Sequence, residues 1–346
     1  MLQERMSLSS SIHMNESIIN LQNMRKLLIV LLMSLGLLHA YAEGEIDGET
    51  YYRVTKVKDS VNLFNGNLRL INIYKQQIAV LYETRNLTEQ QVRAELIKRT
   101  YLPYQEFWEG YVGDSTVYYE QVMKPLIKDS IRIMAKKALT FSSFNIDNFF
   151  NLTASVLNCY SGRTPSGTWF IAFGSGVTDM GGFGNGRMVL DLTHSKAEIG
   201  YVQMILPHEI NHQIYENTIL PDTTARGLYR VINEGFAVYM NQVVFGDKYE
   251  LHEYLQYSVS GLQYCLDNEK AIFSKLKPYL FTNNREHALA LADRGQKPFK
   301  EGPGAIGYFV GFRICEAYVK KHGKESWKDI YSLSPREVLL KSGYGE

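Results

Sequence analysis

The segment that most constrains the fold is an apolar, periodic stretch near the middle of this 346-residue chain. Its apolar residues recur at roughly helical spacing, which predicts a buried helix: Val202, Ile205, Leu206, Ile210 and Ile214. Pro207 lies inside this stretch, where a proline removes one backbone hydrogen bond and costs about 3 kcal/mol. A helix that begins near Pro207 would avoid that cost, because proline is tolerated in the first turn. We expect a bent helix instead, because the apolar spacing runs through from about Ile199.

The same stretch carries two histidines and a glutamate in the pattern H-E-x-x-H. Residues four apart share one face of a helix, so His208 and His212 can both present an imidazole to one metal ion. Glu209 lies one step round the helix, near enough to hold a water bound to that ion. The alternative is an ordinary amphipathic helix with two surface histidines, because so short a pattern also occurs by chance.

A third candidate ligand, Glu234, lies downstream on a helical pattern of its own. The apolar members of that pattern are Tyr229, Ile232, Phe236, Val238, Tyr239, Val243 and Val244. Two neutral imidazoles and a carboxylate that leave a fourth position open form the ligand set of a catalytic zinc site. The sequence therefore predicts one zinc ion held by His208, His212 and Glu234, and it indicates metal-assisted hydrolysis.

The amino-terminal region has the pattern of an export signal. Residues 27–38 form a mainly apolar run that follows two basic residues, and residues 39–42 fit a small-residue cleavage site. The run is short for a spanning helix, although a retained membrane anchor is the alternative. No cysteine follows it, which argues against a bacterial lipoprotein anchor. We expect residues 1–23 to be an over-extended start, residues 24–42 a signal peptide, and the mature protein exported, either periplasmic or secreted.

Charge and cysteine content exclude several classes of partner. Removing residues 1–42 takes three basic and two acidic side chains from a chain of net charge +1, which leaves a formal charge of zero. A neutral protein has no electrostatic basis for binding nucleic acid or an anionic membrane surface. The three cysteines, Cys159, Cys265 and Cys315, show no zinc-ribbon spacing, and we expect them to be buried structural residues.

Residues 43–346 contain no linker rich in proline, glycine or serine, which favours a single domain. Its first part, residues 43–155, mixes strand and helix patterns. Three short runs in it are typical of strands, namely Tyr51–Val57, Leu68–Tyr74 and Ile78–Tyr82, with a turn signal at Asn65-Gly66. From Thr88, a candidate N-cap, the composition turns helical to about Lys137, with breaks at Pro103 and Pro125.

Two further strand patterns flank a glycine-rich loop. Thr168–Phe173 predicts a buried strand, and Arg187–Leu192 predicts a second one. The glycines between them match no phosphate-binding pattern, so a flexible hairpin that borders a cleft is the better interpretation. In zinc proteases an edge strand just before the active helix commonly pairs with an extended peptide, and by analogy we expect Arg187–Leu192 to be such a strand.

The C-terminal part is mainly helical. Residues 304–321 predict one helix, which Gly323 stops. Ser334-Pro335-Arg336-Glu337 is a complete helix start, with a cap, a first-turn proline and a capping-box glutamate, and Gly343 ends that helix. Together with the strands upstream, this predicts an α+β fold.

The layout of H-E-x-x-H followed by N-E-G-x-A on a second helix resembles the gluzincin group of zinc peptidases. The C-terminal segments at 307–314, 318–321, 333–335 and 341–344 are also similar to an uncharacterised family of predicted zinc-dependent proteases, and the similarity covers about residues 190–346. It implies a zincin-like fold with a small mixed sheet, an active-site helix and a mainly helical C-terminal part. It also implies that the zinc ligands are His208, His212 and Glu234.

The resemblance further implies a secreted zinc metallopeptidase, a hydrolase that cleaves peptide or protein substrates with Glu209 as general base. Tyr308, in the G-Y-x-x-G segment, is the candidate for stabilising the oxyanion, with a core aromatic as the alternative. Asp191 and His194 either orient a ligand or end a strand in a loop. Asn233 is placed to help fix the helix pair.

A second interpretation is a protein of the zincin fold that binds a peptide or partner without hydrolysing it. The intact Glu209 argues against this, because a site without catalysis has no use for a base there. A non-peptide hydrolase and a merely structural metal site are further alternatives. The sequence leaves open the substrate, the cleavage side, the oligomeric state and the role of residues 43–155.

Overall fold

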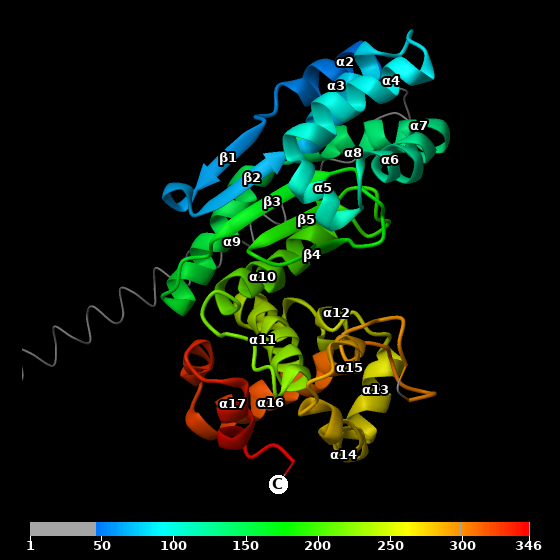
Figure 1. Cartoon of the computed structure of the whole chain (residues 1–346). Coiled ribbons are helices and arrows are strands. Elements are labelled where there is room, and N and C mark those ends of the chain that lie inside the picture. Colours follow the sequence, from blue (N-terminus) through cyan, green and yellow to red (C-terminus); the bar gives the residue numbers. More distant parts are fainter. Residues whose placement is uncertain (1–45, 298, 346) are drawn as a thin grey trace, which may run out of the picture. The chain divides into compact units, whose positions relative to one another are not determined.

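The computed structural model describes residues 46–297 and 299–345, which belong to one compact unit, Gly44–Glu346. The expected start region and signal peptide, residues 1–42, lie outside the described residues. The described residues form a mainly helical structure around one five-stranded mixed sheet (Figure 1). The predicted α+β class and the small mixed sheet are confirmed. None of the described helices is long and apolar enough to span a membrane.

The sheet has the strand order β1-β2-β3-β5-β4. Its strands are β1 (Ser60–Leu63), β2 (Leu68–Asn72), β3 (Gly167–Ala172), β4 (Met180–Gly182) and β5 (Arg187–Asp191). The three central strands are parallel, and β1 and β4 pair antiparallel at the two edges. The prediction that Arg187–Leu192 is an edge strand is therefore wrong, because β4 folds back from the glycine-rich loop and covers it. The hydrophobic pattern of a strand does not encode which neighbours it pairs with.

Strand β3 holds a helix against each face of the sheet, because successive side chains of a strand point to opposite faces. Trp169 is fully buried, and its Nε1 donates a hydrogen bond of 2.8 Å to Gln213 Oε1 of α10 (Ile199–Tyr215). Phe170 points the other way and stacks on Phe107 of α5 (Gln105–Tyr111), with ring centroids 4.1 Å apart. The sheet thus positions α10, the helix with both histidines.

The N-terminal part is more helical than the sequence predicts. Its other helices are α2 (Gly48–Thr55), α3 (Ile73–Glu83), α4 (Glu89–Leu96), α6 (Ser115–Val117), α7 (Lys124–Asp129), α8 (Ile131–Ser143) and α9 (Ile146–Ser161). The strands predicted at Tyr51–Val57 and Ile78–Tyr82 are wrong, because these residues lie mostly in α2 and α3. The buried side chains of α3 recur at helical spacing, a signal that the β-favouring residue types concealed.

Predictions from local turn and cap patterns in the same region are confirmed. The strand predicted at Leu68–Tyr74 is present as β2, and Asn65-Gly66 forms the turn before it with positive φ at both residues. Thr88 caps α4 through a complete capping box. Each of these features depends on neighbouring residues alone, which is why the sequence predicts them.

The C-terminal part follows its predicted boundaries closely. Its helices are α11 (Arg226–Phe245), α12 (Leu251–Tyr254), α13 (Val259–Asp267), α14 (Glu269–Leu280), α15 (Arg285–Ala290), α16 (Ile306–His322) and α17 (Pro335–Ser342). Gly323 ends α16, and α17 has the predicted cap, proline and capping box. Cys265 and Cys315 are buried free thiols as predicted, whereas Cys159 is exposed.

Candidate metal centre

Helix α10 passes through the interior of the protein at the two histidines. It continues through Pro207, as the apolar spacing predicts, and every residue from Ile205 to Tyr215 is buried. His208 is 4% exposed and His212 is 8% exposed. The alternative of two surface histidines on an amphipathic helix is therefore excluded.

Glu234 reaches the two histidines from α11, and the three residues form one cluster. Glu234 Oε2 lies 3.5 Å from His208 Nε2 and 3.3 Å from His212 Nε2. The two histidine Nε2 atoms lie 3.1 Å apart. The structure thus brings together the three residues predicted as ligands, which come from two helices.

Two glycines let α11 and α16 approach each other closely enough to complete the site. A Cβ at Gly235 would collide with the backbone of Gly311, and a Cβ at Gly311 would collide with the carbonyl of Val231. Glu234 on α11 and Tyr308 on α16 lie beside the contact between the two helices. The N-E-G and G-Y-x-x-G segments therefore meet where α11 crosses α16. This crossing fixes the side chains of Glu234 and Tyr308 at the cluster.

The spacing of the three atoms matches the edges of one small coordination tetrahedron. Ligands about 2.0–2.1 Å from a tetrahedral zinc ion lie about 3.3 Å from one another. The three separations observed here, from 3.1 to 3.5 Å, bracket that value. Glu234 Oε2 and His208 Nδ1 are buried and have no hydrogen-bond partner among the described residues, although Glu234 Oε2 is close enough to either histidine to form an ion pair if that histidine is protonated. The donor set and the unpartnered carboxylate oxygen fit a zinc ion, so zinc binding stays a prediction that the geometry supports.

Asn233 orients one of the histidines. Its Oδ1 lies 2.9 Å from His212 Nδ1, and its Nδ2 donates to Glu216 Oε1 at 2.8 Å. Because the amide nitrogen is engaged with Glu216, the oxygen faces His212 and selects the tautomer protonated at Nδ1. That tautomer leaves the Nε2 lone pair directed at the cluster, as a metal ligand requires. The predicted role of Asn233 in fixing the helix pair thus has a specific geometry.

Burial and the charges within the cluster shift its ionisation strongly. Burial lowers the pKa of His208 to about 4 and raises the pKa of Glu209 to about 8. Burial also opposes a charge on His212, but the Glu234 carboxylate outweighs it and raises the pKa of His212 to about 10. His212 in turn holds the pKa of Glu234 well below its ordinary value, against the effect of burial. A metal-free cluster is thus a buried His212–Glu234 ion pair beside a neutral His208, which is the alternative to a metal site.

Glu209 and Tyr308 also lie at the cluster. Glu209 is 8% exposed, and its Oε1 lies 4.0 Å from His208 Nε2. The Tyr308 ring is parallel to the His208 ring within 3°, with centroids 5.9 Å apart. The structure therefore brings all five predicted site residues together, while the catalytic roles assigned to these two stay untested predictions.

Asp191 and His194 take the second of their two predicted roles, at the end of a strand. The Asp191 carboxylate accepts hydrogen bonds from the backbone of Gly174, Gly176 and Thr193 and from the Tyr111 hydroxyl, at 2.7–2.9 Å. His194 Nδ1 accepts from the backbone N–H of Lys196, 3.2 Å away. Both residues are engaged in the loop after β5 rather than with the three candidate ligands.

Four residues near the cluster were not predicted, because they come from separate loops and from the far end of α10. Tyr201 precedes His208 on α10 and donates a short hydrogen bond to Asp179. The Arg294 guanidinium lies over the Tyr308 ring, 4.8 Å from its centroid, and Lys196 lies 5.6 Å from the Tyr201 ring centroid. No spacing rule connects Asp179, Lys196 and Arg294 in the sequence, so only the fold shows that they are neighbours.

Comparison with known proteins gives one match. Residues 201–346 match the family model described as gliding motility protein GldB. The match begins inside α10 and includes both histidines, Glu209, Glu234 and Tyr308. No curated protein and no solved structure matches the chain. A zincin-like arrangement in particular therefore has no structural match to support it.

This match corrects the assignment made from the motifs. The family that the C-terminal part resembles is that of a gliding motility protein, not of gluzincins or predicted zinc-dependent proteases. The same match shows that the prediction of a secreted zinc metallopeptidase is wrong, together with the hydrolase activity that it implies. The H-E-x-x-H pattern predicts which side chains gather on a helix, but it does not specify the reaction, if any, that they perform.

Proposed function

We propose that this protein is an exported, envelope-associated protein that binds a peptide or protein partner without hydrolysing it. The observation that carries the proposal is the family match, which names a motility protein and spans the whole cluster. That description names no hydrolytic activity, which favours partner binding over turnover of a substrate. The signal pattern in residues 24–42 supports export, either to the periplasm or beyond the cell.

We further propose that His208, His212 and Glu234 hold one zinc ion that stabilises the binding-competent form. The tetrahedral spacing, the unpartnered Oε2 of Glu234 and the tautomer set by Asn233 support this part of the proposal. Zinc bound there would fasten α10 to α11, whose side chains contribute the ligands. Its role would then be structural, as in the many zinc sites that contribute folding energy outright.

The test is zinc content and hydrolysis measured on the same purified protein. We expect about one zinc per chain in the wild type and none in His208→Asn or Glu234→Gln, because each of these variants removes a ligand. His194→Asn is the matched control, because His194 bonds within the loop after β5, and it should keep its zinc. We expect no cleavage of a mixed peptide library at any zinc occupancy.

Two results would contradict the proposal in different ways. A wild-type protein without zinc would leave the cluster as a buried His212–Glu234 ion pair and remove the metal from the proposal. Zinc-dependent cleavage of peptides that disappears in Glu209→Gln would overturn the non-hydrolytic function itself. Glu209→Gln is the decisive variant because it alters no proposed zinc ligand.

A further inference from the structure

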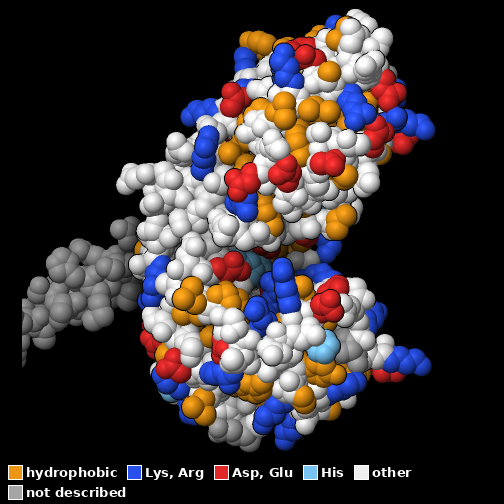
Figure 2. Space-filling model, in the orientation of Figure 1, with side chains coloured by type: hydrophobic (Ala, Val, Ile, Leu, Met, Phe, Trp, Pro, Cys, Tyr) orange, Lys and Arg blue, Asp and Glu red, His pale blue; other side chains and the backbone are white. Residues whose placement is uncertain are grey.

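Two cationic side chains from different loops lie next to the cluster and are held by the same turn. Lys196, between β5 and α10, donates from Nζ to Gln256 Oε1 at 2.7 Å. Arg294, between α15 and α16, donates from Nη1 to the carbonyl of Leu255 at 3.1 Å. Leu255-Gln256 therefore fixes both cations, although they are far apart in the sequence. Figure 2 shows Lys and Arg side chains at a hollow in the surface, beside a His side chain.

Both cations lie over aromatic rings that belong to the site. Arg294 lies over Tyr308, whose ring is parallel to that of His208. Lys196 lies near the ring of Tyr201, two helical turns before His208 on α10. These contacts connect the two positive charges to the metal centre through one side chain each. A group bound to both cations would therefore lie beside the two rings that connect them to the cluster.

Neither cation has an acidic partner within the described residues. Arg294 bonds to a backbone carbonyl oxygen and Lys196 to an amide oxygen, and neither forms an ion pair within those residues. The nearby Asp179 carboxylate accepts from Tyr201 and from the backbone of Met180. Burial lowers the pKa of Lys196 and the positive charge of Arg294 lowers it further, while the Asp179 carboxylate raises it in part. Two like charges held near each other repel, and an anion between them would remove that repulsion.

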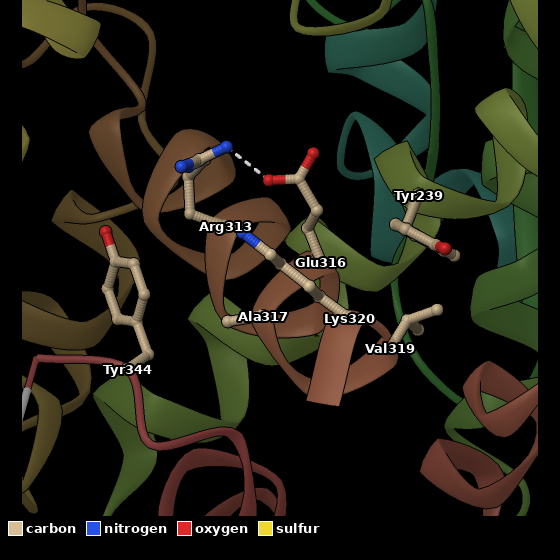
Figure 3. A pocket seen from close by; sticks show the side chains of 7 residues that line it. All are labelled: Tyr239, Arg313, Glu316, Ala317, Val319, Lys320 and Tyr344. Carbon is tan, nitrogen blue, oxygen red and sulfur yellow. Dashed lines mark hydrogen bonds and ion pairs between the residues drawn. The ribbon is translucent and has the colours of Figure 1, made fainter. Parts of the chain in front are cut away.

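A pocket elsewhere in the molecule contains an arginine whose charge is neutralised by ion pairs, which allows a comparison. The pocket in Figure 3, of about 530 Å³, is lined by Tyr239, Arg313, Glu316, Ala317, Val319, Lys320 and Tyr344. There Arg313 forms ion pairs with Glu269 at 2.8 Å and with Glu316. Its charge is paired directly with two carboxylates, whereas Lys196 and Arg294 bond directly only to neutral oxygens within the described residues. The two sites therefore differ in their capacity to attract an anion from outside.

The segments that hold the two cations contain residues in an unusual backbone conformation. Gln256 and Ala305 both have positive φ, at 55° and 52°, which side chains with a Cβ rarely adopt. A Cβ at Gly304 would collide with the carbonyl of Arg294, and the N–H of Ala305 donates to the Asp293 carbonyl at 2.8 Å. Such conformations persist where the surroundings enforce them, and they concentrate at ligand-binding sites.

We infer that Lys196 and Arg294 form an anion subsite that binds a carboxylate of the partner, beside the His208–His212–Glu234 cluster. The inference rests on the proposed partner-binding function and specifies the chemistry of the partner. An arginine guanidinium and a lysine ammonium recognise a carboxylate through charge-assisted hydrogen bonds, and Arg294 can offer two parallel donors. The carboxylate comes either from an acidic side chain or from the C-terminus of a peptide.

The experiment measures retention of short random peptides on the immobilised, zinc-loaded mature chain. One pool is neutral with an amidated C-terminus, one is the same pool with added Asp and Glu, and one is neutral with a free C-terminal carboxylate. We expect at least one carboxylate-bearing pool to be retained about tenfold more than the neutral pool. The pool that gains identifies whether the carboxylate is a side chain or a terminus.

Variants separate a binding role from a structural one. Lys196→Gln and Arg294→Gln should lose most of the preference for carboxylates while retaining the neutral pool as before. Arg294→Lys should keep part of the preference because it keeps the charge. Lys320→Gln, an exposed lysine at the other pocket, is the matched control and should keep all of it.

The outcomes distinguish this inference from the function on which it rests. If all pools are retained equally, or if Arg294→Gln keeps the full preference, the anion subsite is wrong while partner binding stands. If no pool is retained above a blank resin, partner binding of peptides fails, and the subsite fails with it.

Discussion

The protein buries two carboxylates in ways that differ sharply. Asp191, fully buried at the end of β5, accepts four hydrogen bonds, three from backbone N–H groups of the neighbouring loops and one from the Tyr111 hydroxyl of α5. Glu234, 6% exposed on α11, accepts one hydrogen bond on Oε1 from Arg230, while its Oε2 faces two histidine nitrogens without a hydrogen bond. The first carboxylate is fully satisfied within the described residues, and the second is not.

This difference separates a structural group from a candidate ligand. A buried charge is costly unless hydrogen bonds and counter-charges compensate it. The backbone N–H groups of Gly174, Gly176 and Thr193 and the Tyr111 hydroxyl compensate Asp191. The cluster around Glu234 leaves an oxygen and two imidazoles directed at one point, which is the arrangement expected of a site completed by an ion.

The largest effect is expected where the backbone itself places Glu234. Gly235→Ala should lower the free energy of unfolding by about 4 kcal/mol, because its Cβ would collide with the backbone of α16 and neither helix can yield cheaply. Urea unfolding measures this. Gly200→Ala, on exposed α10 surface with open space around it, is the control and should stabilise by about 0.5–1 kcal/mol. Equal behaviour of the two variants would show that the helix crossing does not fix the site.

A somewhat smaller effect is expected at the satisfied carboxylate. Asp191→Asn should cost about 3 kcal/mol, because the new amide group turns a donor towards the N–H groups that Asp191 accepts from. The loss should be the same with and without a zinc chelator in the unfolding experiment. A chelator-dependent loss would mean that Asp191 serves the metal centre after all.

Removal of zinc should affect only the unsatisfied carboxylate. With zinc at about a hundred times its dissociation constant, chelation should lower the stability of the wild type by about 2.7 kcal/mol. Glu234→Gln should show no chelator effect, whereas Asp191→Asn should show the full one. Thermal melts with and without chelator measure both, and a wild type that does not respond would remove the distinction drawn between the two carboxylates.

The smallest effect is expected at a carboxylate that is well partnered but exposed. Hydrogen bonds from Thr224, and then Arg336, lower the pKa of Asp222 to about 2. The folded-state pKa is below the unfolded value of 3.8, so this stabilisation is present above pH 3.8 and is lost as the pH falls towards 2. Because solvent screens the pair, Asp222→Asn should cost under about 1 kcal/mol near neutral pH and nothing near pH 2. If Asp222→Asn lost as much stability as Asp191→Asn, burial would not determine how much a carboxylate contributes to stability.

The sequence predicts the features of this site that depend on residues close together in the chain. His208 and His212 share a face because they lie four apart, and the apolar spacing around them predicts a buried helix through Pro207. Glu234 required one further assumption, that its helix packs against the first. The cap of α17 at Ser334 is local in the same sense, and it is confirmed.

Features that depend on tertiary neighbours were missed for a physical reason. The edge strand was assigned to Arg187–Leu192, because a two-residue period does not specify strand order. The helical stretch at Ile78–Tyr82 resembled a strand, because tertiary packing overrides residue propensity. Lys196 and Arg294 lie on separate loops, and the turn that holds both is visible only in the fold.

The three cysteines differ in their accessibility to thiol-reactive dyes. One is exposed and can be labelled in the native protein, and two are buried and can report local opening. Burial raises the pKa of Cys265 to about 12 and also raises that of Cys315, so neither supplies the thiolate that reacts with a maleimide. Cys159 is exposed at the end of α9 and is free to react. A dye added to the native protein should therefore mark one position. The appearance of a second and a third label over time would then record how often the helices of the C-terminal part open.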